Sequence, residues 1–186
     1  MLLARLLWDK GVGEYAAAAR LLRKRFPQAE FCALGFVESP SPTAIPRAQI
    51  DAWVAEGVLN YLGVTDDVRP HIVSADCVVL PSYYKEGIPR SLLEAAASGR
   101  PIITTNVVGC REVVEDEVNG LLCRPRDVAD LAAKLERMMT LPHEARIEMG
   151  RRGRAKMERE FDEQIVINSY LEVIEEILEP RDAKAG

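Results

Sequence analysis

Short apolar segments alternate with longer, helix-like segments along most of the 186-residue chain. We expect strands at residues 2–7, 30–37, 58–62, 77–80, 101–105 and 121–123. Helical periodicity and helix-ending residues predict helices between them, at residues 12–25, 48–56, 68–74, 88–98, 110–115 and 127–139. Continuous apolar strands separated by helices are typical of a parallel sheet that is covered on both faces. The alternation therefore predicts an α/β fold, a Rossmann-like, doubly wound parallel sheet of about six strands with helices on both faces.

Two further helices are expected after the last strand. Residues 142–160 form a charged segment, and residues 163–178 carry an apolar stripe at helical spacing. Because no strand follows, these helices must pack on the sheet or on something outside this chain. We therefore divide the chain into a Rossmann-like domain at 1–160, a C-terminal helix at 161–180 and a flexible tail at 181–186.

Composition restricts the class of protein. A hydrophobic content of 48% and a charged content of 28% fit a soluble globular domain. The net charge of −5 argues against a general nucleic-acid-binding surface. No apolar run approaches the roughly 20 residues that a membrane-spanning helix needs, and no signal-peptide pattern is present.

The cysteines give no indication of a metal or a disulfide framework. Cys32, Cys77, Cys110 and Cys123 are widely spaced, and no pair has the Cys-x-x-Cys arrangement. We interpret them as reduced core residues of a cytoplasmic protein. We accordingly expect no metal site and no cofactor.

The segment 86–94 holds two carboxylates, Glu86 and Glu94, around a predicted helix start. The apolar strand at 77–80 leads through a loop containing Gly87 into this helix, and Pro89 suits its first turn. The first N–H groups of a helix have no intrahelical partner and can bind an anion. Carboxylates beside such a pocket can accept hydrogen bonds from sugar hydroxyls, which suggests a ligand that carries both phosphate and sugar. The alternative is that Glu94 is a solvated helix residue and Glu86 a loop charge.

Several spaced motifs carry a resemblance to a known family. They lie at residues 5–11, 80–82, 86–94, 98–102 and 109–122. Together they resemble the C-terminal, donor-binding half of the family 4 retaining glycosyltransferases of the GT-B fold. Residues 86–114 are most similar to bacterial enzymes that build polysaccharide or glycan on a lipid carrier. In that family an N-terminal domain with the acceptor site precedes this half, so the resemblance implies an excised C-terminal domain whose last helix crosses back to the N-terminal one.

The resemblance also implies roles for individual residues. Arg5 and Lys10 would hold the diphosphate of the donor, Glu94 the ribose hydroxyls, and Glu86 the transferred sugar. The catalytic set would thus be Arg5, Lys10 and Glu86. The donor-binding set would be Arg5, Lys10, Tyr61, Glu86, Gly87, Ile88, Pro89, Arg90 and Glu94. By the same resemblance, the segment at residues 60–63, which contains Tyr61, would lie near the nucleobase. Arg5 and Lys10 could instead be ordinary surface charges, and the segment around Tyr61 could be only a strand and its turn.

The function that the resemblance implies is retaining transfer of a hexose or N-acetylhexosamine from a UDP-sugar to a glycan or a lipid-linked acceptor. Such transfer would need no metal, would involve no nucleic acid, and would be weak without the N-terminal domain. Membrane association, if any, would be peripheral and would come through the full-length enzyme. Two alternatives stay open: a non-catalytic nucleotide or nucleotide-sugar binding module, and half of a sugar-nucleotide epimerase.

Overall fold

The computed structural model describes residues 1–37, 40–84 and 87–178 and contains one six-stranded sheet. Its strands are β1 (Leu2–Leu3), β2 (Cys32–Leu34), β3 (Asn60–Tyr61), β4 (Val78–Leu80), β5 (Ile102–Thr105) and β6 (Gly120–Cys123). All neighbouring strands are parallel, in the order β3-β2-β1-β4-β5-β6. This is the doubly wound order, in which the direction of winding reverses beside β1. The predicted fold class is confirmed.

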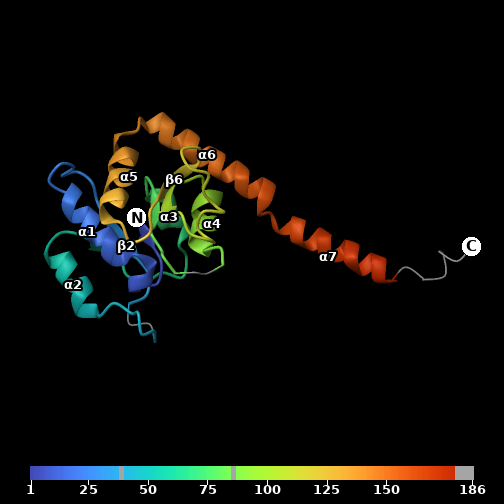
Figure 1. Cartoon of the computed structure of the whole chain (residues 1–186), viewed down its shortest axis with the longest axis horizontal. Helices are drawn as coiled ribbons and strands as arrows, with labels where there is room; N and C mark the ends of the chain where they lie inside the picture. The colour runs from blue at the N-terminus through green and yellow to red at the C-terminus, as the bar shows by residue number, and fades with distance from the viewer. Residues whose placement is uncertain (38–39, 85–86, 179–186) are drawn as a thin grey trace, which may run out of the picture.

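Helices cover both faces of this sheet (Figure 1). One buried apolar cluster joins it to α1 (Val12–Leu22), α2 (Arg47–Ala55) and α5 (Val128–Thr140). A second cluster, on the other face, includes side chains of α3 (Arg69–Ser74), α4 (Arg90–Ala97) and α6 (His143–Glu160). The central strands β1 and β4 are buried on both sides, which explains why they are continuously apolar in sequence, whereas the edge strand β3 carries the exposed Asn60.

Most strands are shorter than the apolar runs predict. The apolar run that begins at Leu2 continues to Leu7, but ladder pairing ends at Leu3. Leu6 and Leu7 remain fully or nearly buried in the loop that follows β1. Apolar character reports burial rather than strand pairing, so it cannot mark where a ladder ends.

The predicted helix at residues 110–115 is wrong, because residues 110–113 form turns and residues 114–115 have no regular structure. Gly109 adopts φ +90° just before the segment, and the side-chain amide of Asn119 donates to the Val113 carbonyl within it. The conformation of Gly109 and the hydrogen bond to the Val113 carbonyl leave only a few residues between them. So short a segment forms too few helical hydrogen bonds to offset the cost of nucleating a helix. The four cysteines, in contrast, are free thiols as expected, and three of them are buried.

Asp127 is the N-cap of α5. The Asp127 side chain accepts a 2.9 Å hydrogen bond from the backbone N–H of Asp130. Asp127→Ala removes this acceptor and is expected to lower stability by about 1 kcal/mol, or roughly 2–4 °C in melting temperature. Thermal unfolding followed by circular dichroism measures it. Asp127→Asn keeps the capping oxygen but loses the ion pair with Arg124, so equal loss in both variants would contradict a capping role.

Helix α7 (Glu163–Leu178) extends away from the domain (Figure 1). None of its residues is buried, and its apolar side chains are exposed, among them Val166, Tyr170, Ile174 and Ile177. No helix in the described part of the chain is long and apolar enough to cross a membrane. The division of the chain at residue 160 and the crossing of this helix to a second domain both stay predictions.

Candidate functional site

The loops that follow the first three strands meet α4 at the carboxyl edge of the sheet, where ligands bind in doubly wound folds. A cavity of about 180 Å³ lies there. Its lining includes Arg5 after β1, Phe36 after β2 and Thr65 after β3, together with Ser91 and Glu94 of α4. The cavity thus joins two predicted donor-binding residues that are far apart in sequence.

Arg5 and Glu94 give this cavity one cationic and one anionic wall. The Arg5 side chain is exposed, and it forms no ion pair with any carboxylate of the described residues. Glu94 is half-buried, and its carboxylate lies 3.7 Å from the guanidinium of the exposed Arg90. An unpaired guanidinium can bind phosphate oxygens bidentately, and a half-buried carboxylate can accept hydrogen bonds from hydroxyls. The pair therefore suits a ligand that carries both groups.

Lys10 belongs to the short 3₁₀ helix η1 (Trp8–Lys10) that follows the loop after β1. Lys10 is only 8% exposed, and its ammonium lies 5.8 Å from the centroid of the Tyr84 ring. It does not line the cavity that contains Arg5 and Glu94. It lies instead beside the loop that connects β4 to α4, which is the loop predicted to bind phosphate.

Asp9 links three of the loops at this edge. Its carboxylate accepts a 2.9 Å hydrogen bond from the Thr43 hydroxyl, and its backbone carbonyl accepts from the Tyr83 N–H and the Ser82 hydroxyl. A backbone hydrogen bond from Trp8 to Thr43, 2.8 Å long, adds to the same contact. The loops after β1, β2 and β4 are therefore fixed to one another before any ligand binds.

Gly11 brings the loop after β1 against the loop after β4. It has φ +75°, and a Cβ at this position would lie 2.2 Å from the Pro81 carbonyl oxygen. Only glycine combines this left-handed conformation with so close an approach. The same residue precedes α1, so it sets both the helix start and the contact between the two loops.

The start of α4 lies at the same edge. Pro89 is buried and precedes the first helical residue, Arg90, while Gly87 and Ile88 are exposed. The predicted sugar-binding residue Glu86 lies outside the described residues. The helix therefore begins one residue later than a first-turn proline predicts.

Tyr61 does not line the cavity but holds one of its walls. Its hydroxyl donates a 2.9 Å hydrogen bond to the Gly35 carbonyl, and the Arg47 guanidinium lies over its ring. The sequence did not single out Phe36 or Thr65 as cavity residues. Phe36 lies at the end of the predicted strand 30–37 and Thr65 shortly after the predicted strand 58–62, and these positions are the signal that could have indicated them.

Tyr83 and Arg126 form a further contact at this edge. The Arg126 guanidinium lies 4.3 Å from the centroid of the Tyr83 ring, and Arg126 adopts φ +58°. Partial burial raises the pKa of Tyr83, so its hydroxyl stays protonated at neutral pH.

No three His, Cys, Asp or Glu side chains gather closely enough to hold a metal ion in residues 1–37, 40–84 and 87–178.

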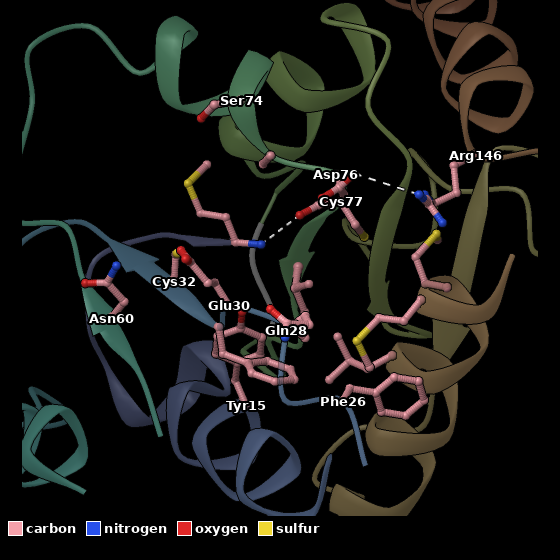
Figure 2. Close-up of a pocket in the computed structure, with 18 of the residues that line it drawn as sticks. Tyr15, Phe26, Gln28, Glu30, Cys32, Asn60, Ser74, Asp76, Cys77 and Arg146 are labelled. Carbon is pink, nitrogen blue, oxygen red and sulfur yellow. Dashed lines mark hydrogen bonds and ion pairs between the residues drawn. The ribbon is translucent and has the colours of Figure 1, made fainter. Parts of the chain in front are cut away.

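A larger cavity, of about 890 Å³, lies at the opposite, amino edge of the sheet (Figure 2). Tyr15, Phe26, Cys32 and Cys77 are among its lining residues, and Asp76 and Arg146 face each other across it at 3.9 Å. Burial raises the pKa of Cys77 to about 12, so this thiol is not a nucleophile at neutral pH. None of the predicted site residues lines this cavity, and the amino edge is not where doubly wound folds bind ligands.

Known proteins share this fold and parts of this sequence. Over 179 residues the chain is 30% identical to an N,N'-diacetylbacillosaminyl-diphospho-undecaprenol alpha-1,3-N-acetylgalactosaminyltransferase of Campylobacter jejuni, covering 96% of this chain and 44% of that protein. The crystal structure of HepE from Anabaena in complex with UDP has a TM-score of 0.81 at 22% identity and covers 94% of this chain and 48% of that one. The chain thus spans less than half the length of both proteins.

A solved domain of similar extent also matches. The C-terminal domain of LpcC, a glycosyl transferase group 1 family protein of Francisella tularensis, gives a TM-score of 0.68 at 22% identity, covering 87% of this chain and 83% of that one. Residues 1–140 of the present chain match the family described as Glycosyl transferases group 1. Since that match extends over most of the chain and the sheet order and carboxyl-edge cavity agree with it, the chain belongs to the group 1 glycosyl transferases.

Proposed function

We propose that this chain binds the nucleotide diphosphate sugar donor of a glycosyltransferase, with a UDP-sugar favoured. The observation that carries the proposal is the cavity at the carboxyl edge, which Arg5 and Glu94 line together. These residues come from opposite ends of the first hundred residues, and the fold brings them to one small site. The UDP complex of HepE supports the choice of nucleotide.

The roles of the residues follow from their chemistry. Arg5 offers a planar guanidinium to the diphosphate, and Lys10 adds a point charge from the adjacent loop. Glu94 accepts hydrogen bonds from the ribose hydroxyls. The amides around Gly87, Ile88 and Arg90, at the start of α4, complete the phosphate site. These groups stabilise the negative charge that develops on the departing diphosphate, so the transfer depends on positioning and electrostatics and needs no metal.

The acceptor and the reaction outcome complete the proposal. We propose retaining transfer of a hexose or N-acetylhexosamine to a glycan or lipid-linked acceptor, and the name of the Campylobacter jejuni relative supports a diphosphate-linked lipid. A second domain, joined to this one in a full-length enzyme, would carry the acceptor site and receive α7. The chain alone would bind the donor and transfer little. We place the enzyme in the cytoplasm, where nucleotide sugars are expected.

Calorimetric titration with UDP, GDP and ADP tests the proposal. We expect selective binding of UDP by the wild type and a loss of about tenfold or more in Glu94→Gln, because hydrogen bonds to a charged acceptor are lost while the side-chain shape is kept. Glu158→Gln, on the exposed side of α6, is the matched control and should bind as the wild type does. If the folded wild type binds none of the three nucleotides at millimolar concentration, the proposal is wrong.

A further inference from the structure

Phe36 has an exposed ring where the cavity becomes apolar. Phe36 is 59% exposed, whereas the other three phenylalanines, all within the described residues, are buried or half-buried. Phe36 is one of the residues that line the cavity of Arg5 and Glu94. An exposed aromatic side chain beside a small cavity leaves one π-face available to a planar ligand.

The sheet order separates the polar from the apolar lining of the cavity. Arg5 follows β1 and Glu94 lies on α4, whereas Leu34 and Phe36 belong to β2 and the loop after it, and Val64 follows β3. Because β2 and β3 lie on the far side of β1 from β4, these apolar side chains are gathered on one side of the cavity. A nucleoside diphosphate has the same division, since its phosphates and ribose are polar and its base is flat and aromatic. With the diphosphate at Arg5 and the ribose at Glu94, the base reaches the apolar side.

The backbone that carries Phe36 is held in place. The Leu6 N–H donates to the Phe36 carbonyl at 2.8 Å, and the Gly35 N–H donates to the Gly63 carbonyl at 2.9 Å. The Tyr61 hydroxyl donates to the Gly35 carbonyl. A Cβ on Gly35 would lie 1.8 Å from the Ala4 carbonyl oxygen, so only glycine permits this close approach. The ring is therefore presented by a preorganised turn, which lowers the cost of ordering it on binding.

We infer that the Phe36 ring is the platform on which the nucleobase of the donor stacks. The inference rests on the proposed function and adds to it a residue that contacts the base. Aromatic side chains stack on any base, because every base has a π-face. Tyr61 then acts as a positioning residue: it does not touch the base but holds the Gly35–Phe36 turn.

Phe36→Leu tests the inference, because leucine keeps an apolar side chain and removes the π-face. By calorimetry we expect UDP to bind about tenfold more weakly than to the wild type, while inorganic pyrophosphate, which lacks a base, binds equally to both. Tyr170→Leu is the matched control, since it removes another exposed aromatic ring, on α7 and outside the cavity. In the wild type, NMR should show nuclear Overhauser contacts between the uracil ring protons and the Phe36 ring protons.

The outcomes separate this inference from the proposed function. If the wild type binds UDP but Phe36→Leu binds it within about twofold and the contacts are absent, stacking on Phe36 is wrong while donor binding stands. If Phe36→Leu weakens UDP and pyrophosphate equally, the substitution disturbs the whole site and stacking is also wrong. If the folded wild type does not bind UDP, the proposed function fails and the inference fails with it.

Discussion

Gly11→Ala should be among the most destabilising single substitutions in this chain. An L-residue at φ +75° costs about 1–2 kcal/mol in backbone strain, and the new methyl group would lie 2.2 Å from the Pro81 carbonyl oxygen. The clashing oxygen belongs to the backbone of Pro81, which directly follows β4, so it cannot rotate away as a side chain could. The clash can be relieved only if the two loops separate. We expect a total loss of roughly 3 kcal/mol, which corresponds to about 6–12 °C in melting temperature.

Gly57→Ala is the matched control for this expectation. Gly57 has nearly the same left-handed conformation, φ +70°, but the nearest atom to an added Cβ would be 3.9 Å away. Gly57→Ala should therefore introduce only the backbone strain, which lowers stability by about 1–2 kcal/mol. Urea and thermal unfolding of both variants isolate the contribution of the contact between Gly11 and Pro81. Equal melting temperatures would contradict a steric role for this contact.

Gly11→Ala should also affect ligand binding. Gly11 directly follows Lys10, and the loop after β4 that it touches leads to Tyr84 and then to α4. Separating the two loops would move the Lys10 ammonium away from the loop predicted to bind phosphate. A variant that folds at low temperature but binds UDP more weakly than Gly57→Ala would connect this packing contact to the site.

The sheet could be predicted from the sequence because its central strands are buried on both faces. Residues such as Val78, Val79 and Leu80 leave no polar position that water could contact, and helices lie between such runs. The exact ladders could not be predicted, since Leu6 is as buried as Leu2 although only Leu2 pairs. Burial sets the composition of a segment, whereas pairing depends on the position of its neighbours.

The site could be predicted only in part. Arg5 and Glu94 lie in recognisable motifs, and the fold does bring them to one cavity. Phe36 lies in no such motif. Asp9 does lie in the motif at residues 5–11, but its role comes from a contact between loops that are distant in sequence, the hydrogen bond from Thr43 to Asp9. The turn at residues 110–115 was predicted as a helix because local propensity does not include the Asn119 side chain that satisfies its backbone.

Arg5→Gln is expected to weaken UDP binding by about 10- to 150-fold, since hydrogen bonds to charged groups contribute roughly 1.5–3 kcal/mol. Glutamine keeps a polar side chain but lacks the charge and the two-pronged donor geometry. Arg5→Lys keeps the charge alone and should fall between the wild type and Arg5→Gln. Uridine, which has no phosphate, should bind equally to all three proteins. Calorimetry with UDP and uridine measures each of these values.

Comparing the affinities of the Arg5 variants for UDP and for uridine shows whether the loss of affinity comes from the diphosphate, because uridine lacks it. If Arg5→Gln lost affinity for both ligands equally, the guanidinium would be shaping the cavity rather than binding phosphate. Arg152→Gln, an exposed arginine on α6 that is paired with Glu148, controls for the change in net charge. A direct contact also predicts that the difference between wild type and Arg5→Gln shrinks as salt is added, because an exposed charge such as Arg5 is screened by ions. A purely structural role for Arg5 would leave that difference independent of salt.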